Sequence, residues 1–346
     1  MTQPLSDLTA QLLDLARKAG ADQADAIAVE GTSVSIDVRA GALEQAERSE
    51  GVDIGLRVLI GQRQANVSSS DTKPDTLRQM VERAIAMAKE APEDPYAGLA
   101  DVAQLAKSTD NSALELFDPS EEPDPAALQE DAARAEAAAL ENKGISQVQS
   151  ASAGYNKSRV HLSASNGFSA GYARTSRGLS CVAISGTGTG MERDYDYDSR
   201  IFQSELRDAA DIGSIAAERA VERVGARKSK TGAYPVLFDE RISSSLIGHL
   251  LQATNGAAIS RGSSWLRDAL GEQVLPDGLS IIEDPHRVRT SSSRMFDAEG
   301  LATSRRAIVD NGTLTGWTLD LANARKLGME STANAVRGTS SPLRCH

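Results

Sequence analysis

Gly51-Val-Asp-Ile-Gly-Leu-Arg-Val-Leu-Ile-Gly61 carries an apolar side chain at every second position between its first and last glycine. A period of two is typical of a β-strand with one buried face. The same alternation occurs earlier, at Val34, Ile36 and Val38, and Gly41 lies between the two runs. Because glycine at such positions favours a turn, we expect half-buried antiparallel strands in this region.

Apolar residues spaced three and four apart predict amphipathic helices on both sides of these strands. Leu5, Leu8 and Leu12 show this period first, and Pro74 favours the first turn of a second helix. Asn-Gly pairs at 166–167 and 311–312 predict β-hairpins. The expected helices cover residues 6–19, 74–91, 124–142, 211–224, 239–252 and 319–327, with β-structure at 33–60, 144–197, 234–238 and 306–317.

The length of 346 residues and the 40% apolar content are enough for two folded units. A basic, glycine-containing stretch from Arg227 to Gly232 interrupts the pattern, and we place the domain boundary there. The sequence thus predicts an α+β protein with two domains. Residues 1–227 form an N-terminal domain of helices and antiparallel sheet. Residues 228–346 form a C-terminal β-rich domain with short helices, which is incomplete here.

Composition argues against several classes of protein. The 37 basic and 48 acidic residues give a net charge of -11, so the chain repels nucleic-acid phosphates and direct nucleic-acid binding is disfavoured. Neither a membrane span nor a signal peptide is predicted, because long apolar runs do not occur. Cys181 and Cys345 are the only cysteines, which is too few for a zinc ribbon or a disulfide framework. We expect a cytoplasmic protein without membrane contact.

One motif is typical of a nucleophile. Gly167-Phe-Ser-Ala-Gly171 matches the G-x-S-x-G elbow, in which a sharp strand-to-helix turn exposes a catalytic serine. Here the motif follows a predicted hairpin turn and lies within alternating β sequence. We therefore expect Ser169 to be an ordinary strand residue, and a hydrolase that uses Ser169 is the alternative.

A second motif is typical of a calcium site. The aspartates at 194, 196 and 198, together with Glu205, have the carboxylate spacing of a calcium-binding loop. Ser199 occupies the position where a glycine makes the sharp bend of that loop. A strand with a solvated acidic face accounts for the three aspartates without a metal, and this is the interpretation we prefer.

The four histidines do not form a recognisable zinc motif, since neither H-E-x-x-H nor H-E-x-x-x-H occurs. His161 lies in an alternating run and is expected on a polar sheet face. His249 lies on the apolar row of its predicted helix, as a core histidine would. His286 follows Glu283-Asp-Pro in a predicted loop, where a capped turn is a simpler interpretation than a catalytic site.

The run from Gly51 to Gly61 is followed by a helical segment, Val81-Glu-Arg-Ala-Ile-Ala-Met-Ala88, and the second half of the chain holds an ordered set of further segments. These segments are Tyr234-Pro-Val-Leu-Phe238, Gly248-His-Leu250, Asp268-Ala-Leu-Gly271, Glu283-Asp-Pro-His286, Phe296-Asp-Ala-Glu-Gly300 and Ala324-Arg-Lys-Leu-Gly328. In these segments, and along essentially its full length, the sequence resembles the TldD/PmbA family, and within it the PmbA/TldE-type branch.

The resemblance implies a cytoplasmic heterodimer with a TldD-like subunit, which processes flexible peptides by zinc-dependent hydrolysis in a chamber between the subunits. In TldD-like chains a His-Glu pair and a second His at the start of a helix bind zinc and activate water. This chain has Asp239, Glu240 and Arg241 at the matching junction, and Ser243 and Ser244 where further ligands would fall. A carboxylate and hydroxyls do not replace two imidazoles as zinc ligands.

The resemblance therefore implies a non-catalytic subunit that shapes the substrate channel, with no catalytic or metal-binding residues of its own and with zinc in its partner. His286, Arg287, Asp297 and Glu299 are candidates for residues of the channel or its loops. The alternative function is that of an interaction protein, a modulator related to gyrase or toxin–antitoxin systems, which acts without proteolysis.

The end of the sequence also differs from the family. Members continue beyond the Arg337-Gly-Thr-Ser-Ser-Pro342 stretch with further strands, whereas this sequence ends at His346. We expect a truncated or frame-shifted product, in which Cys345 and His346 have no ligand role. A C-terminal sheet without its closing strands would expose an edge.

Overall fold

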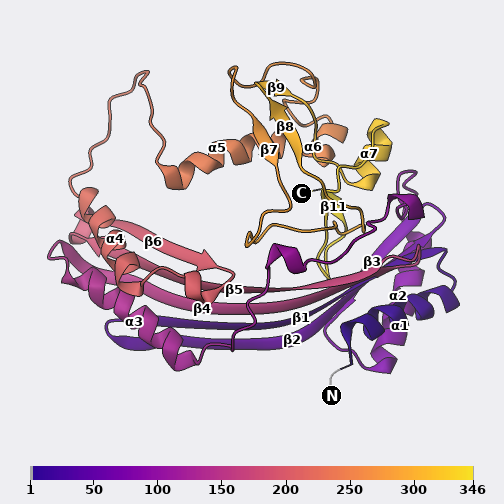
Figure 1. The fold of residues 1–346 in the computed structure, drawn as a ribbon, viewed down its shortest axis with the longest axis horizontal. Helices are drawn as coiled ribbons and strands as arrows, with labels where there is room; N and C mark the ends of the chain where they lie inside the picture. Colours follow the sequence, from indigo (N-terminus) through magenta and orange to yellow (C-terminus); the bar gives the residue numbers. More distant parts are fainter. Residues whose placement is uncertain (1–2, 346) are drawn as a thin grey trace.

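A long, curved, six-stranded antiparallel sheet dominates the computed structural model, which describes residues 3–345 (Figure 1). The strand order is β3-β2-β1-β4-β5-β6. The strands are β1 (Gln23–Arg39), β2 (Ala42–Ile60), β3 (Arg63–Ser69), β4 (Ile145–Ala164), β5 (Ser169–Ser185) and β6 (Glu192–Arg200). The predicted strands are confirmed, and burial alternates at Val34, Ile36 and Val38 as predicted. The prediction of a half-buried strand is wrong for residues 54–59, which are buried on both faces because other elements pack on both sides of the sheet there.

The strands differ greatly in how far they pair. β1 and β2 are joined at a tight turn, where Ala40 and Gly41 have φ of 53° and 72°, and they pair from Arg39↔Ala42 to Gln23↔Leu59. The short strand β3 pairs with β2 only from Ile54 to Ile60. The first part of β2 therefore forms an outer edge of the sheet.

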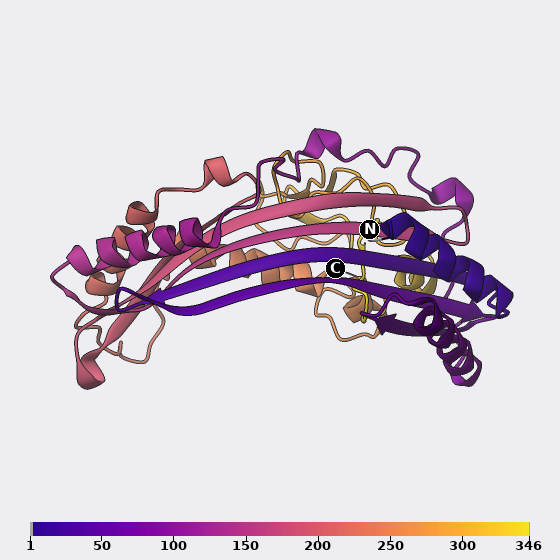
Figure 2. The same cartoon turned by 90° about the horizontal axis from the view of Figure 1, so that it is seen from below.

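Two pairs of helices cover the two ends of the convex face (Figures 1 and 2). Helices α1 (Leu5–Lys18) and α2 (Pro74–Glu90) pack at one end, and α3 (Pro125–Glu141) and α4 (Ala209–Glu222) at the other. Their apolar rows bury residues such as Leu12 and Ile212 completely. Between the two pairs, the middle of the convex face is left uncovered by helices.

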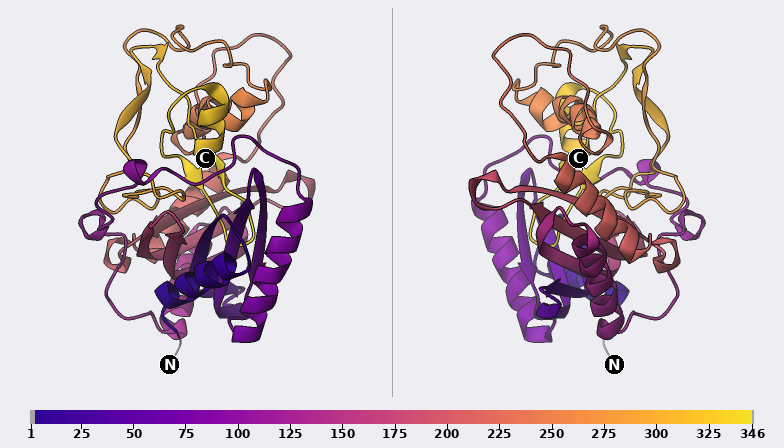
Figure 3. Two further views of the ribbon diagram at one scale, coloured as in Figure 1. Left: turned by 90° about the vertical axis from the view of Figure 1, so that its right-hand side faces the viewer. Right: turned by 90° about the vertical axis from the view of Figure 1, so that its left-hand side faces the viewer.

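A smaller C-terminal part lies over the concave face of the sheet, opposite the helices (Figure 3). Phe168 and Phe296 join the two layers, with ring centroids 5.2 Å apart. The elements of this part are α5 (Glu240–Ala253), α6 (Gly256–Ser260), β7 (Ile281–Glu283), β8 (Arg306–Asp310), β9 (Thr313–Leu314), α7 (Leu321–Leu327), β10 (Ala335–Val336) and β11 (Arg344–Cys345). Short 3-10 helices lie at Val102–Gln104, Ser112–Leu114, Gly188–Gly190 and Gln203–Glu205.

The α+β prediction is confirmed, and both hairpins form where an Asn-Gly pair predicts them. At the second hairpin Asn311 and Gly312 have φ of 45° and 84°, as a two-residue turn of this kind requires. The proposed domain boundary lies in the irregular chain between α4 and α5 and stays a prediction. Within the described residues, no helix combines the length and the apolar character needed to cross a membrane.

Two local predictions are wrong. Residues 234–238 form no strand, and Leu237 is 98% exposed, because no other strand of the described chain lies beside this segment to pair with it. His249 is exposed rather than buried, as are Ile242 and Leu246 on the predicted apolar row of α5. Of this row only Leu250, near the end of the helix, is buried in the C-terminal core. The apolar pattern therefore predicted the helix correctly but not the exposure of its first half.

Candidate functional site

The start of α5 holds Asp239, Glu240 and Arg241, the position at which the family resemblance predicts a degenerate zinc motif. The carboxylate of Asp239 accepts a hydrogen bond from the backbone N–H of Arg241 at 3.0 Å and so caps the helix. The guanidinium of Arg241 donates to Asp194 at 2.7 Å and to Asp239 at 3.0 Å. It also lies 5.5 Å from the ring centroid of Tyr195, within cation–π range. These contacts fasten the start of α5 to strand β6.

Of the three serines that follow, Ser244 is exposed, and the hydroxyls of the other two are hydrogen-bonded to their own helix. Ser243 donates to the carbonyl oxygen of Glu240 at 3.0 Å, and Ser245 donates to that of Ile242 at 2.5 Å. The turn therefore presents one carboxylate engaged as a helix cap, one exposed glutamate and a fixed guanidinium. Among the described residues, no group of three or more His, Cys, Asp or Glu side chains is placed to hold a metal ion.

Strand β6 shows why Arg241 is held firmly, and it corrects one prediction. Asp194, Asp196 and Asp198 are buried, whereas Tyr195 and Tyr197 between them are exposed, so the acidic face is not the solvated one. The carboxylates are buried because arginines neutralise them. The pairs are Asp194 with Arg223 and Arg241, Asp196 with Arg207 and Arg219, and Asp198 with Arg200.

The pKa of Asp194 shows that pairing outweighs burial at this site. Desolvation acts to raise it, but hydrogen bonds from Arg241, the backbone of Tyr195 and Arg223 hold the pKa of Asp194 below its ordinary value. Asp194 is therefore ionised at neutral pH and keeps the guanidinium of Arg241 in place. The alternation of aspartates with tyrosines predicted a strand, but the burial of the acidic face depends on arginines from other parts of the chain, among them Arg207, Arg219 and Arg241.

A cavity of about 700 Å³ lies beside the second half of α5. At one side Glu283 accepts hydrogen bonds from Arg306 at 2.8 Å and from Asn334 at 2.6 Å. Arg294 is held more loosely, at 3.4 Å from Glu283, and its Nε is buried without a hydrogen-bond partner. The lining residues also include Gly248, Leu251, Gln252, Ile281, Ile282 and Ile308. This cavity has the size and the mixed apolar and polar lining of a ligand pocket.

The remaining candidates from the sequence serve separate networks. His286 lies on an exposed loop, and its Nε2 is 3.0 Å from the hydroxyl of Thr303. The carbonyl oxygen of the neighbouring Arg287 accepts a hydrogen bond from Ser293. Neither residue lines the 700 Å³ cavity. His286 and Arg287 therefore belong to a hydrogen-bonded loop, as the sequence predicted.

Asp297 and Glu299 hold loops together from within. The carboxylate of Asp297 accepts hydrogen bonds from the backbone N–H groups of Glu299, Leu301 and Ala335, at 2.9 to 3.1 Å. Glu299 accepts one from Leu321 at the start of α7. Burial raises the pKa of Asp297 to about 6 and that of Glu299 to about 8, in the second case with the nearby charge of Asp297 adding to the rise.

The structure places Ser169 in a hydrogen-bonded polar cluster under α1. Its hydroxyl is 3.3 Å from that of Ser163, which lies 3.1 Å from the hydroxyl of Thr9. Thr9 in turn contacts Nδ1 of His161 at 2.9 Å. Ser169 is the first residue of β5 and not part of a strand-to-helix elbow, as expected from the sequence. The sequence did not predict that α1 covers His161.

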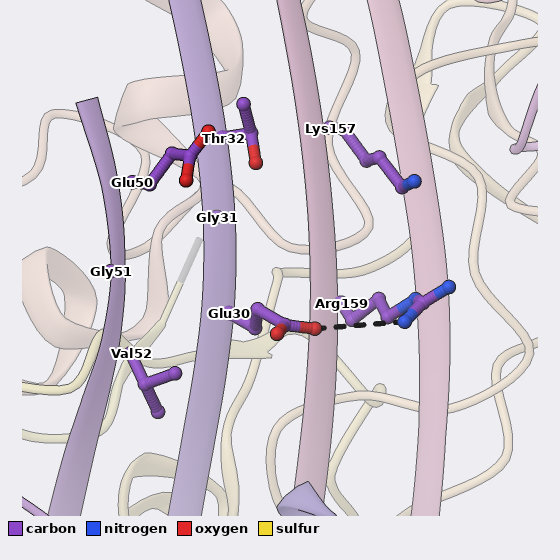
Figure 4. Close-up of a pocket in the computed structure, with 8 residues that line it drawn as sticks. All are labelled: Glu30, Gly31, Thr32, Glu50, Gly51, Val52, Lys157 and Arg159. Atoms are coloured by element: carbon purple, nitrogen blue, oxygen red, sulfur yellow. Dashed lines mark ion pairs between the residues drawn. The ribbon is translucent and has the colours of Figure 1, made fainter. Parts of the chain in front are cut away.

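A second cavity, of about 380 Å³, lies on the uncovered middle of the convex face (Figure 4). Its side chains come from three neighbouring strands, with Val52 and Arg159 opposite Glu30. Glu50 and Lys157 lie opposite Thr32 in the same way. Gly31 and Gly51 complete the floor. Glu30 on β1 and Arg159 on β4 form an ion pair at 3.6 Å in this cavity.

Family models cover most of the chain. They match the PmbA/TldA metallopeptidase domain 1 at residues 24–88, the central domain at 118–224 and the C-terminal domain at 231–346. This chain therefore belongs to the PmbA/TldD family of metallopeptidases.

Individual relatives agree with this assignment. The metalloprotease PmbA of Escherichia coli O157:H7 is 36% identical over 333 residues, which are 96% of this chain and 73% of the relative. The PmbA homologue of Haemophilus influenzae is 34% identical, with the same coverage of both chains.

Solved structures share the fold. A proposed modulator of DNA gyrase from Bacteroides thetaiotaomicron superposes with a TM-score of 0.89 and 27% identity, covering 98% of this chain and 76% of that one. TldE from Thermococcus kodakarensis gives a TM-score of 0.79 at 19% identity, covering 97% of this chain and 75% of that one. The second likeness concerns the fold alone.

Proposed function

We propose that this chain is the non-catalytic, PmbA/TldE-type subunit of a two-subunit zinc metallopeptidase, located in the cytoplasm. It forms a heterodimer with a TldD-like subunit, which holds the zinc ion, and it shapes the channel through which unstructured peptides pass. In this proposal the chain itself binds no cofactor. The division into residues 1–227 and 228–346 is part of the same proposal.

The observation that carries the proposal is the guanidinium of Arg241 in the first turn of α5. A hydrolytic relative needs imidazoles and a free carboxylate at this turn to bind zinc and to activate water. Here Asp239 is engaged as the helix cap, and Arg241 adds a positive charge that opposes binding of a divalent cation. The buried, ionised Asp194 holds that charge in place.

The test compares the purified chain with a TldD-like protein, each alone and mixed. Zinc content is measured by elemental analysis, and cleavage is measured with an unstructured fluorogenic peptide. We expect no zinc and no cleavage for this chain alone, and faster, chelator-sensitive cleavage in the mixture than with the TldD-like protein alone. Stoichiometric zinc and chelator-sensitive cleavage by the single chain would reject the proposal.

A second candidate is a modulator of gyrase that acts without proteolysis. It is favoured by the likeness to the structure from Bacteroides thetaiotaomicron described as a proposed modulator of DNA gyrase. Because the net charge of -11 repels DNA phosphates, such a modulator would contact the gyrase protein rather than DNA. Capture of purified gyrase by this chain, in the absence of a TldD-like protein, would support it over the first proposal.

A further inference from the structure

The first part of β2 is an open edge of the long sheet. β3 pairs only with Ile54–Ile60, and in the described part of the chain no strand pairs with the outer side of residues 42–53 (Figure 2). Nearly every residue of this segment is exposed. A strand of this length extends for roughly 40 Å at about 3.3 Å per residue. The backbone groups on its outer side are available to hydrogen-bond an added strand.

The charges along this edge select the kind of strand that fits. The segment Ala42–Asp53 contains four acidic side chains but only one basic side chain, Arg48, which is paired with Glu50 and Glu122. Asp53 makes no ion pair in the described chain, and Glu47 is hydrogen-bonded only to Gln45. A second copy of this edge would bring the same excess of negative charge. Like charges on facing strands are unfavourable, whereas opposite charges are favourable.

The cavity in Figure 4 adjoins this edge on the convex face. Glu50 and Val52 belong both to the open edge and to the lining of the cavity, and Glu30 lies next to Val52 on β1. A residue of an added strand that faces the same way as Glu50 would stand about 5 Å from it. A lysine or arginine there would meet the carboxylate of Glu50, and its aliphatic stem would lie beside Val52.

We propose that the open edge of β2, residues 42–53, binds an extended peptide as an added strand, and that a basic side chain on the cavity side of the peptide pairs with Glu50. Main-chain hydrogen bonds supply affinity without regard to sequence, and alternate side chains supply specificity. This proposal takes one premise from the proposed function, namely that the ligand is an unstructured peptide.

The probe is a fluorescent peptide of about twelve residues that alternates lysine and threonine, matched in length to the edge. Its binding to this chain alone is followed by fluorescence anisotropy, without metal or partner. We expect saturable binding, and slower amide hydrogen exchange in residues 42–53 when the peptide is present. The same peptide with N-methyl groups at every backbone nitrogen should lose binding, because neither of its edges can donate hydrogen bonds to the ladder.

Charge-reversal variants separate this edge from the rest of the acidic surface. Glu50→Lys should weaken binding by about tenfold or more, which corresponds to at least about 1.4 kcal/mol. The matched control is Glu82→Lys, an exposed position on α2 far from the edge in sequence, with the same change in net charge. The control should bind within about twofold of the unchanged chain.

Three outcomes would overturn the proposal. The first is equal binding of the N-methylated peptide, which would indicate charge attraction alone. The second is that the peptide slows amide hydrogen exchange elsewhere in the chain but not in residues 42–53. The third is a dimer of this chain, with residues 42–53 already protected before the peptide is added. Failure of the accessory-subunit proposal would instead be observed as zinc-dependent cleavage by the single chain, which the binding assay does not measure.

Discussion

At the scale of single residues, Arg241 makes the contact that ties the start of α5 to strand β6. Its side chain is 22% exposed, and that of its partner Asp194 is 5% exposed. Asp194 keeps a second partner in Arg223, at 3.2 Å. The contact with Arg241 is therefore one of two that neutralise a buried carboxylate, and it is the one that reaches α5.

Arg241→Ala should destabilise the protein by about 1–3 kcal/mol, because a buried carboxylate loses a charged hydrogen-bond donor but retains another. The free energy of unfolding in urea measures this, and hydrogen exchange should show faster opening of α5 than of the long sheet.

The matched control for this change is Arg267→Ala. The Arg267–Asp268 pair is 55% and 86% exposed, so its loss should cost within about 0.5 kcal/mol. Equal losses in the two variants would show that the contact between Arg241 and Asp194 does not anchor the helix.

At the scale of elements, a polar cluster around Thr9 links α1 to the sheet. This residue is fully buried, and its hydroxyl contacts the carbonyl oxygen of Ser6, Nδ1 of His161 and the hydroxyl of Ser163. Burial lowers the pKa of His161, which favours the neutral imidazole in the folded protein. The polar cluster thus stays uncharged within an otherwise apolar contact.

Thr9→Val removes the hydroxyl with little change in shape. His161 and Ser163 lose a partner, so we expect a loss of about 1–3 kcal/mol in the free energy of unfolding, measured by urea denaturation. Thr72→Val is the control, since the side chain of Thr72 is half-buried and makes no hydrogen bond in the described chain. Its effect should stay within about 0.5 kcal/mol. A neutral Thr9→Val variant would contradict a role for the cluster in docking.

The elements also show how far the sequence predicts this molecule. Alternation and Asn-Gly pairs predicted the long strands and hairpins, because these features depend on neighbouring residues. The burial of Asp194, the exposure of Leu237 and the contact of His161 with α1 depend on residues remote in sequence, and no local pattern reports them. At the candidate site, the sequence predicted the absence of imidazoles from the start of α5 but not the contact that holds Arg241.

At the scale of the whole molecule, a buried charged network joins the long sheet to the C-terminal part. Asp25 on β1 accepts a hydrogen bond from Arg57 on β2 at 2.6 Å and forms an ion pair with Arg337 near the C-terminus. Gly55 allows this approach, since a Cβ atom there would lie 2.3 Å from the carbonyl oxygen of Thr339. Glu299, whose pKa burial raises, feels the charge of Arg57.

The raised pKa of Glu299 makes stability depend on pH in a defined direction. Folding favours the protonated carboxyl, because the folded-state pKa of about 8 exceeds the ordinary value of 4.5. This contribution is fully present below the ordinary pKa and is lost as pH rises towards about 8. Linkage limits the slope for one group to about 1.4 kcal/mol per pH unit. Asp297 titrates in the same direction, but its pKa of about 6 confines its effect to lower pH.

Glu299→Gln should therefore become more stable relative to the unchanged protein as pH rises from about 6.5 to about 8.5, because glutamine cannot ionise while its amide oxygen can still accept the hydrogen bond from Leu321. Urea denaturation at several pH values within this window measures the difference. Glu90→Gln, an exposed change of the same chemistry on α2, is the control. A stability difference between Glu299→Gln and the unchanged protein that stays constant across this pH range would contradict the prediction. It would show that the carboxyl of Glu299 is ionised in the folded protein throughout the range.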